Sequence, residues 1–352
     1  MTVSGGFPAP GPQDRGTPPP RLPPVAPGAA GLPRPLTPTL AVYRPGIVPL
    51  RPLLLGDILD GAVKAIRFNP KPMVGISVIV LAVFLIPSAA AGMAATHLGV
   101  GVLSTLGPGA EAFLGVPSSM IEGLFTGLAT ALLSGVLCYV VGQAVLGRKP
   151  DVGRTWRSTR GRLPALLGLG VLSALFSLLT LTVLIGPGVL LLVNSNLGAG
   201  LLSLFLGLLA LVAFGLAVST KISMTAPAMV LEDLGVIAGL RRSFSLTRGA
   251  AFWRVLGITL LAQLMASVAG VLLGMPFSIL GTGLAVLSGQ GTESAQMIVT
   301  FVAHLSALLT GAITTPFVAA VTGLLYIDRR MRLEALDVTL LREAQANPAP
   351  RI

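Results

Sequence analysis

The sequence has very little cysteine and very little charge. Its 352 residues include one cysteine, Cys138, which excludes an intrachain disulfide and a multi-cysteine metal site. Only 11% of the residues are charged, whereas soluble domains carry about 25%. Hydrophobic residues make up 53% of the chain. The low charge excludes an ordinary soluble globular fold, and the high apolar content excludes disorder over the whole chain.

Acidic residues are scarcer than basic ones. Aspartate and glutamate number 13 against 24 lysines and arginines, which gives a formal net charge of +11. All the basic residues fall before residue 72, within 148–162, within 221–254 or after residue 327. Because these four segments flank long apolar runs, we interpret the charge as a membrane-topology signal. We therefore expect no nucleic-acid partner, since the basic residues form no single patch.

Motifs of catalysis are also absent from the sequence. It contains no HExxH, no CxxC, no phosphate-binding loop and no nucleophile elbow. An ionisable residue inside a membrane is a candidate functional residue, but the apolar runs contain almost none. His304 is the main exception, and we interpret it as a packing residue rather than a proton relay. We expect no enzyme activity, no metal and no cofactor.

What the sequence does contain is a series of long stretches without charge. They cover 72–110, 123–147, 163–220, 255–292 and 294–327. One bilayer crossing needs about 20 apolar residues, so the third stretch holds two crossings. The stretches are apolar almost throughout, which disfavours the alternating pattern of a membrane β-barrel. The sequence predicts an all-α polytopic membrane protein with six transmembrane helices, near 72–95, 121–146, 163–190, 198–222, 254–279 and 297–327.

The distribution of basic residues also orients these helices. The connections near 97–120, 191–197 and 280–296 contain no lysine or arginine. Since basic residues stay on the cytoplasmic side of a membrane, both termini are predicted to be cytoplasmic. The predicted location is the plasma membrane. Trp156, Trp253 and Tyr326 all fall at the predicted cytoplasmic interface, where aromatic rings favour the headgroup region.

Composition divides the chain into three parts. Residues 1–52 hold 15 of the 28 prolines, which favours a disordered, proline-rich cytoplasmic tail. Its PxxP spacing is compatible with docking to an aromatic groove, although a flexible tail is the simpler interpretation. Residues 53–327 form the six-helix transmembrane domain, and residues 328–352 form a short cytoplasmic C-terminal tail.

Three segments of the chain resemble one another, at 55–80, 151–172 and 235–261. Each has a short amphipathic stretch, a basic residue, a turn-forming residue and then an apolar helix. This order predicts three parallel repeats of an interfacial helix followed by a helical hairpin. Residues 53–68 have apolar side chains at helical spacing, which suits a helix lying in the membrane plane. Chance similarity between apolar sequences is the alternative to a repeat.

Three stretches of sequence resemble a known family. They read RPLLLGDILDGAVKAIRFNP (51–70), APAMVLEDLGVIAGLRRSFSLTRGAAFWRVLGI (226–258) and TPFVAAVTGLLYIDRRMRLEALD (315–337). They resemble the actinobacterial membrane proteins named for the "glycerophosphoryl diester phosphodiesterase membrane domain", over about residues 50–340. In some relatives this region precedes a soluble phosphodiesterase barrel. Only residues 328–352 follow the last helix here, so the resemblance implies a membrane-only protein without transferable catalytic residues.

Two functions remain open at this stage. The first is a membrane-organising or accessory module without catalytic activity, whose basic cytoplasmic face contacts the lipid bilayer and its anionic lipids. Each basic group near an anionic surface contributes about 1 kcal/mol. The expected headgroup-binding residues are Arg157, Arg160, Arg162, Arg241, Arg242 and Arg248, although these residues could instead only fix the orientation.

The second function is a transporter or channel for an apolar or lipid-like solute. The predicted repeat and the prolines inside the helices favour it. A continuous cavity at mid-membrane near Pro276 and Pro316 would support transport, whereas a closed bundle would support the accessory module.

Overall fold

The computed structural model describes residues 46–49, 51–103, 115–194, 196–289 and 293–334. All of these residues belong to one compact unit, Val42–Ile352. The predicted disorder of the proline-rich tail concerns residues up to 45, and the C-terminal tail from residue 335 follows the last described helix, so both predictions lie outside the described residues.

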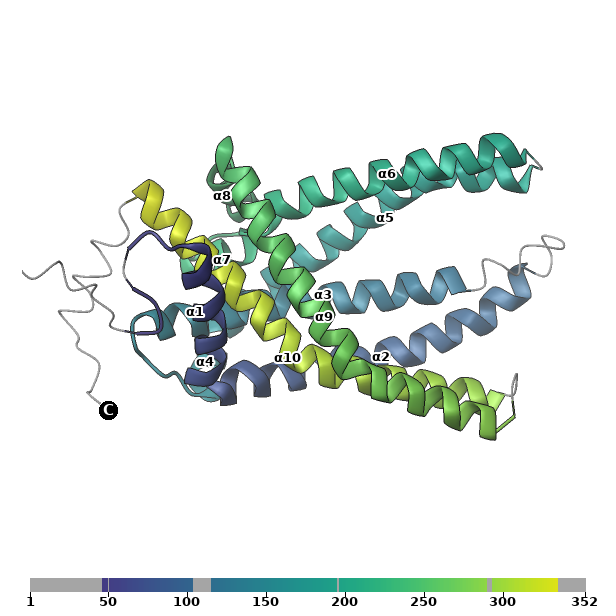
Figure 1. Cartoon of the computed structure of the whole chain (residues 1–352), viewed down its shortest axis with the longest axis horizontal. Coiled ribbons are helices and arrows are strands. Elements are labelled where there is room, and N and C mark those ends of the chain that lie inside the picture. Colours follow the sequence, from purple (N-terminus) through teal and green to yellow (C-terminus); the bar gives the residue numbers. More distant parts are fainter. Residues whose placement is uncertain (1–45, 50, 104–114, 195, 290–292, 335–352) are drawn as a thin grey trace, which may run out of the picture. The chain divides into compact units, whose positions relative to one another are not determined.

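The described residues form α-helices and one short 3-10 helix, with no strand among them. This confirms the all-α class (Figure 1). The elements are α1 (Leu55–Phe68), α2 (Pro70–Leu103), α3 (Gly115–Val145), α4 (Val152–Thr159), η2 (Arg160–Arg162), α5 (Leu163–Val193), α6 (Leu197–Ile222), α7 (Thr225–Leu231), α8 (Val236–Leu246), α9 (Ala250–Leu287) and α10 (Glu293–Glu334).

Six helices in the described ranges are long and apolar enough to cross a membrane: α2, α3, α5, α6, α9 and α10. They confirm the six predicted crossings and make the chain a multi-pass membrane protein. Several extend beyond the predicted ends, and the prolines inside them do not interrupt them. α5 continues through Pro187 to Val193, and α9 continues through Pro276 to Leu287. Neighbouring helices allow such prolines inside a membrane helix.

Local sequence explains several helix ends. Asp151 caps α4 by accepting a hydrogen bond from the Arg154 backbone N–H at 2.9 Å. The Asn196 side chain accepts from Ala199 N at the start of α6. α9 begins after Gly249, whose φ of 62° favours glycine. These residues set the turns that separate the short helices from the long ones.

The long helices pack as three consecutive hairpins, α2–α3, α5–α6 and α9–α10, with the core between α3 and α10. Leu133, Leu137 and Val141 of α3 and Leu324 of α10 are all fully buried. α5 and α6 pack mainly on each other and expose large apolar side chains such as Phe205. Those outward faces suit contact with lipid tails.

The short helices α1, α4, α7 and α8 lie together at one end of the long helices (Figure 1). A short helix precedes each hairpin, in the order α1 before α2, α4 before α5 and α8 before α9. Every lysine and arginine that the structure describes lies on one of these short helices, in a connecting segment next to them, or at the nearby end of a long helix. We call this the basic end. That the three units are copies of one repeat stays a prediction.

The chain that precedes α1 is part of the packed domain. Ile47 N donates a hydrogen bond to Ala144 O at 3.2 Å, and Val48 is 1% exposed. Leu53 is fully buried. The packed part therefore begins before the predicted boundary at residue 52. α1 packs its apolar face partly on α10, while Val63 stays exposed.

A buried carboxylate fastens this segment to α9 and α10. The Asp328 side chain has no exposed surface. It accepts from Leu53 N at 2.8 Å, from Arg332 Nε at 2.9 Å and from Arg254 Nη2 at 3.2 Å. Both arginines also donate to the Leu53 carbonyl, at 2.8 and 2.9 Å. Asp328 thus holds three distant parts of the chain together at the basic end.

Candidate functional site

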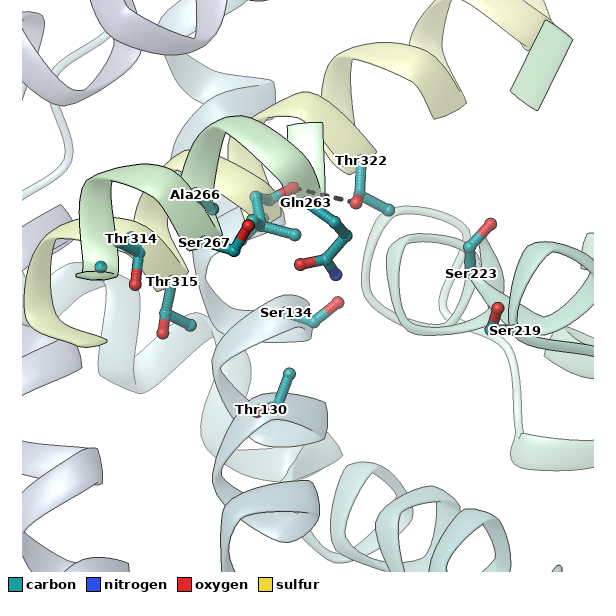
Figure 2. A pocket seen from close by; sticks show the side chains of 13 residues that line it. Thr130, Ser134, Ser219, Ser223, Gln263, Ala266, Ser267, Thr314, Thr315 and Thr322 are labelled. Atoms are coloured by element: carbon teal, nitrogen blue, oxygen red, sulfur yellow. Dashed lines mark hydrogen bonds between the residues drawn. The ribbon is translucent and has the colours of Figure 1, made fainter. Parts of the chain in front are cut away.

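A polar cavity lies between α3, α6, α9 and α10 (Figure 2). Its volume is about 570 Å³. We call it the hydroxyl-lined groove, because eight of its lining residues are serines or threonines. The lining comprises Thr130, Ser134, Ser219, Ser223, Gln263, Ala266, Ser267, Gly270, Thr314, Thr315, Val318, Ala319 and Thr322. None of these residues is charged.

Most of the hydroxyl protons in the groove are already used within the helices. Six of the eight hydroxyls donate to a backbone carbonyl three or four residues earlier, as Thr130 does to Thr126 O at 2.8 Å and Thr322 does to Val318 O at 2.9 Å. Each such oxygen keeps lone pairs for a further partner. The hydroxyl groups of the groove are therefore available to a ligand mainly as hydrogen-bond acceptors.

Gln263 is the longest polar side chain of the groove, and it points into the groove (Figure 2). It follows Arg254 by nine residues on α9, about 14 Å at 1.5 Å per residue, so it lies well inside the apolar length of the helix. Among the described residues its carboxamide has no hydrogen-bond partner. Lipid tails offer none, and an unpaired amide in an apolar medium costs several kcal/mol. The groove is therefore suited to water or a polar ligand group.

Two further cavities share residues with the groove. One of about 140 Å³ shares Ser219, Gln263 and Thr322 with it. Another of about 690 Å³ shares Thr130 and Ser134 with it and includes Glu122 nearer the start of α3. Polar surface therefore continues along α3, from Ser134 to the half-buried Glu122.

The groove lies beside one of the two prolines that the sequence analysis named. Thr314, Thr315 and Val318 flank Pro316, and all three line the groove. Gly270 also lines it and lies six residues before Pro276 on the same helix.

The sequence analysis did not identify the groove. A signal was nevertheless present, because polar residues recur at a spacing of four on several helices. The pairs are Thr130 and Ser134 on α3, Ser219 and Ser223 on α6, Gln263 and Ser267 on α9, and Thr310 and Thr314 on α10. A spacing of four places both members of a pair on one helix face.

Two of the six predicted headgroup-binding arginines form ion pairs with acidic side chains. Arg242 donates to both carboxylate oxygens of Glu232, at 2.9 to 3.0 Å, and pairs with Glu334. Burial opposes its charge, but the hydrogen bonds and charges of Glu232 and Glu334 outweigh burial and raise the pKa of Arg242. Arg162 pairs with Asp233. Both arginines therefore serve to hold the loops together.

The prediction that the Tyr326 ring lies in the headgroup region of the membrane is wrong. This side chain is fully buried and donates its hydroxyl proton to Glu232, instead of lying at the lipid interface. The reason is that α10 packs against the loop after α7, where Glu232 lies. Trp156 and Trp253 do lie exposed at the basic end, at 47% and 71%.

The other four predicted arginines are exposed. Arg157 lies on α4, where its Nε donates to Gly153 O, and Arg160 begins η2. Arg241 and Arg248 lie on and just after α8. The structure brings only these last two together, in a cavity of about 540 Å³ that we call the basic groove. Its lining comprises Lys221, Ile237, Leu240, Arg241, Phe244, Ser245 and Arg248.

The remaining candidates from the sequence have packing roles. His304 contacts Thr300 O at 2.9 Å through Nδ1 and Ser88 Oγ at 3.4 Å through Nε2. Cys138 is buried, with its sulfur 3.7 Å from Ala319 O. Within the described ranges no three histidine, cysteine, aspartate or glutamate side chains gather where they could hold a metal ion.

Comparisons with known proteins place the chain in a family. No curated protein and no solved structure matches it. A family model does match residues 106–327, which include all the residues that line the two grooves. The matched region runs over most of the helical bundle. This chain therefore belongs to a family of unknown function, DUF7544.

Proposed function

We propose that this protein is a membrane transporter, without catalytic activity, that binds a lipid-like solute in the hydroxyl-lined groove. The groove supports this proposal because it places nine polar side chains between helices whose outer faces are apolar. A lipid-like solute has matching parts, because its headgroup needs hydrogen bonds, which the groove offers, and its chains need an apolar surface, which the outer helix faces offer. The uncharged, acceptor-rich lining favours an uncharged headgroup with many hydroxyl donors, such as a polyol or a sugar.

A membrane-organising accessory module is the second candidate. The concentration of lysine and arginine at the basic end supports it, because anionic headgroups attract such a surface. The sequence alone ranks this module first, since the charged residues are visible there and the groove is not. We rank transport first because a cavity between the helices beside Pro316 supports transport, whereas a closed bundle would support the module.

Three further parts of the proposal concern location and ancestry. We propose that the protein lies in the plasma membrane with the basic end and both termini in the cytoplasm. The order of a short helix and a hairpin, found three times, supports a threefold repeat. The proposed kinship with the glycerophosphoryl diester phosphodiesterase membrane domain proteins rests on the sequence stretches quoted above.

Transport is tested by replacing Gln263 with leucine. The probe is a fluorescently labelled glucosylceramide in proteoliposomes, whose movement between leaflets is followed by quenching the outer leaflet. We expect the native protein to accelerate this movement, and Gln263→Leu to slow it about fivefold, as the loss of one hydrogen bond of about 1 kcal/mol predicts.

The matched control is Gln143→Leu, the same substitution on α3 outside the groove lining. It should leave the rate unchanged. Movement of the probe no faster with the native protein than in empty liposomes, or equal slowing by both variants, would contradict transport through this groove.

Orientation is tested with single cysteines, because Cys138 is buried and can be replaced by alanine to give a cysteine-free background. Gly161 at the basic end and Gly198 at the opposite end are both exposed, and a Cβ added at either meets nothing within 4 Å. We expect a membrane-impermeant maleimide to label Gly198→Cys in intact cells and Gly161→Cys only after lysis. The reverse pattern would invert the proposed topology.

A further inference from the structure

The structure points to a binding site for the phosphate of an anionic lipid headgroup in the basic groove, formed by Lys221, Arg241 and Arg248. This inference goes beyond transport and does not depend on the hydroxyl-lined groove. It rests on the position of α8, on the partners of its two adjacent arginines and on the apolar side chains beside them.

The two faces of α8 differ in their contacts. Gly239, Ser243 and Leu246 are buried against the rest of the domain. The Ser243 hydroxyl donates to Lys221 O and accepts from Met224 N at 3.2 Å, which fixes α8 to the end of α6. Arg241 and Phe244 lie on the other face and are exposed. α8 is thus held rigidly enough to present a defined surface.

Lys221 completes the groove from the end of α6. Its Nζ lies 5.9 Å from the ring centre of Phe244 and 5.5 Å from that of Phe252. It also donates to Thr247 O at 3.5 Å. None of these partners is anionic, so no carboxylate among them offsets the positive charge of Lys221.

Arg241 and Arg242 are adjacent in sequence but differ in their partners. Arg242 is neutralised by Glu232 and Glu334. In the part of the chain that the structure describes, neither Arg241 nor Arg248 pairs with a carboxylate, and no acidic residue lines the groove. Three positive charges therefore share a cavity of about 540 Å³. Such a cavity attracts a multiply hydrogen-bonding anion, for which phosphate is well suited.

The surroundings favour a lipid phosphate over a free one. Ile237 is 68% exposed and Phe244 is 47% exposed along the groove, and Trp253 nearby at the start of α9 is 71% exposed. Exposed apolar and aromatic side chains at the end of a membrane helix lie at the headgroup level. There they would contact the glycerol and upper acyl region of the lipid while the three cations hold its phosphate.

The test compares two variants that lose the same charge. Arg241→Gln/Arg248→Gln removes two cations from the groove, and Arg157→Gln/Arg160→Gln removes two exposed cations elsewhere at the basic end. The full-length proteins are placed in phosphatidylcholine nanodiscs that contain a minor fraction of phosphatidylglycerol. Native mass spectrometry then counts the phosphatidylglycerol molecules retained. A cation that hydrogen-bonds the phosphate in the groove is worth at least about a tenfold change in affinity, so we expect about 100-fold weaker retention for the groove variant.

The control variant should retain phosphatidylglycerol nearly as well as the native protein. Equal losses in both variants, or no loss in the groove variant, would overturn the site. Ser245→Glu is a second variant, which adds a carboxylate to the exposed groove lining and should also weaken retention. Retention unchanged by this added carboxylate would count against the site as well.

A competition arm separates the two sources of phosphate. Inorganic phosphate should fail to displace phosphatidylglycerol, because it lacks the apolar part that contacts Ile237 and Phe244. Displacement by inorganic phosphate would assign the groove to a soluble anion and overturn the lipid site. Gln263→Leu should leave phosphatidylglycerol retention unchanged, so a failure of the transport proposal is distinguishable from a failure of this one.

Discussion

Asp328→Asn is expected to destabilise the protein strongly. The substitution removes a fully buried charge that two arginines and the Leu53 backbone share. Removing one partner of a buried ion pair costs about 3–5 kcal/mol, because the other charges are left uncompensated. Arg254 and Arg332 keep about a third of their side chains exposed. Solvent screening therefore places the expected loss near 3 kcal/mol.

The measurement is denaturant unfolding in mixed micelles, with Asp60→Asn as the matched control. Asp60 pairs with Lys64 at 2.5 Å on α1, but both side chains are about half exposed or more. Exposed pairs at this helical spacing contribute about 0.5 kcal/mol or less. Comparable losses in the two variants would show that the Asp328 cluster does not fasten the basic end.

Gly207→Leu is expected to separate the two helices of the α5–α6 hairpin. A Cβ added at Gly207 would lie 2.1 Å from the Leu184 carbonyl oxygen and 3.1 Å from its carbon. Those atoms belong to the backbone of α5, so no side chain can rotate to make room. Overpacking of this kind costs about 1–3 kcal/mol, and the rigid neighbour places the expected loss at the upper end.

Gly215→Leu on the same helix provides the control, because a Cβ added there meets nothing within 4 Å. Leucine favours helix over glycine by somewhat less than about 1 kcal/mol, so this variant should be as stable as the native protein or slightly more stable. Unfolding in micelles measures both variants. A Gly207→Leu protein as stable as Gly215→Leu would contradict the close approach of α5 and α6.

The largest expected effects thus concern the contacts that hold the helices together, and neither contact is visible in the sequence. Asp328 is one of 13 acidic residues, and nothing near it in the sequence indicates that it meets Leu53 and Arg254. Gly207 is one of 43 glycines, and its close approach to Leu184 depends on how α5 and α6 are aligned. Both residues acquire their roles from partners that are remote along the chain or on another helix.

The sequence by itself determines the number of long apolar helices and the end at which the basic residues gather. Both follow from local properties, since about 20 consecutive apolar residues suffice for one crossing and lysine and arginine stay outside the apolar length. Those predictions therefore need no knowledge of which helix packs on which. The boundary between the N-terminal tail and the packed domain is harder to predict from the sequence, because Val48 is buried only through its contacts with α1 and α10.

Only the tertiary structure decides which polar residues are available to a ligand. Arg241 and Arg242 are equivalent in sequence, and they differ because Glu232 and Glu334 fold against Arg242 alone. Tyr326 is an interfacial aromatic residue by position, but it is buried because α10 packs beside Glu232. The hydroxyl-lined groove exists because four helices bring Ser134, Ser223, Gln263 and Thr322 to one cavity. The spacing of four marks a polar face on each helix, but only the packing between distant segments decides which of these faces meet in one site.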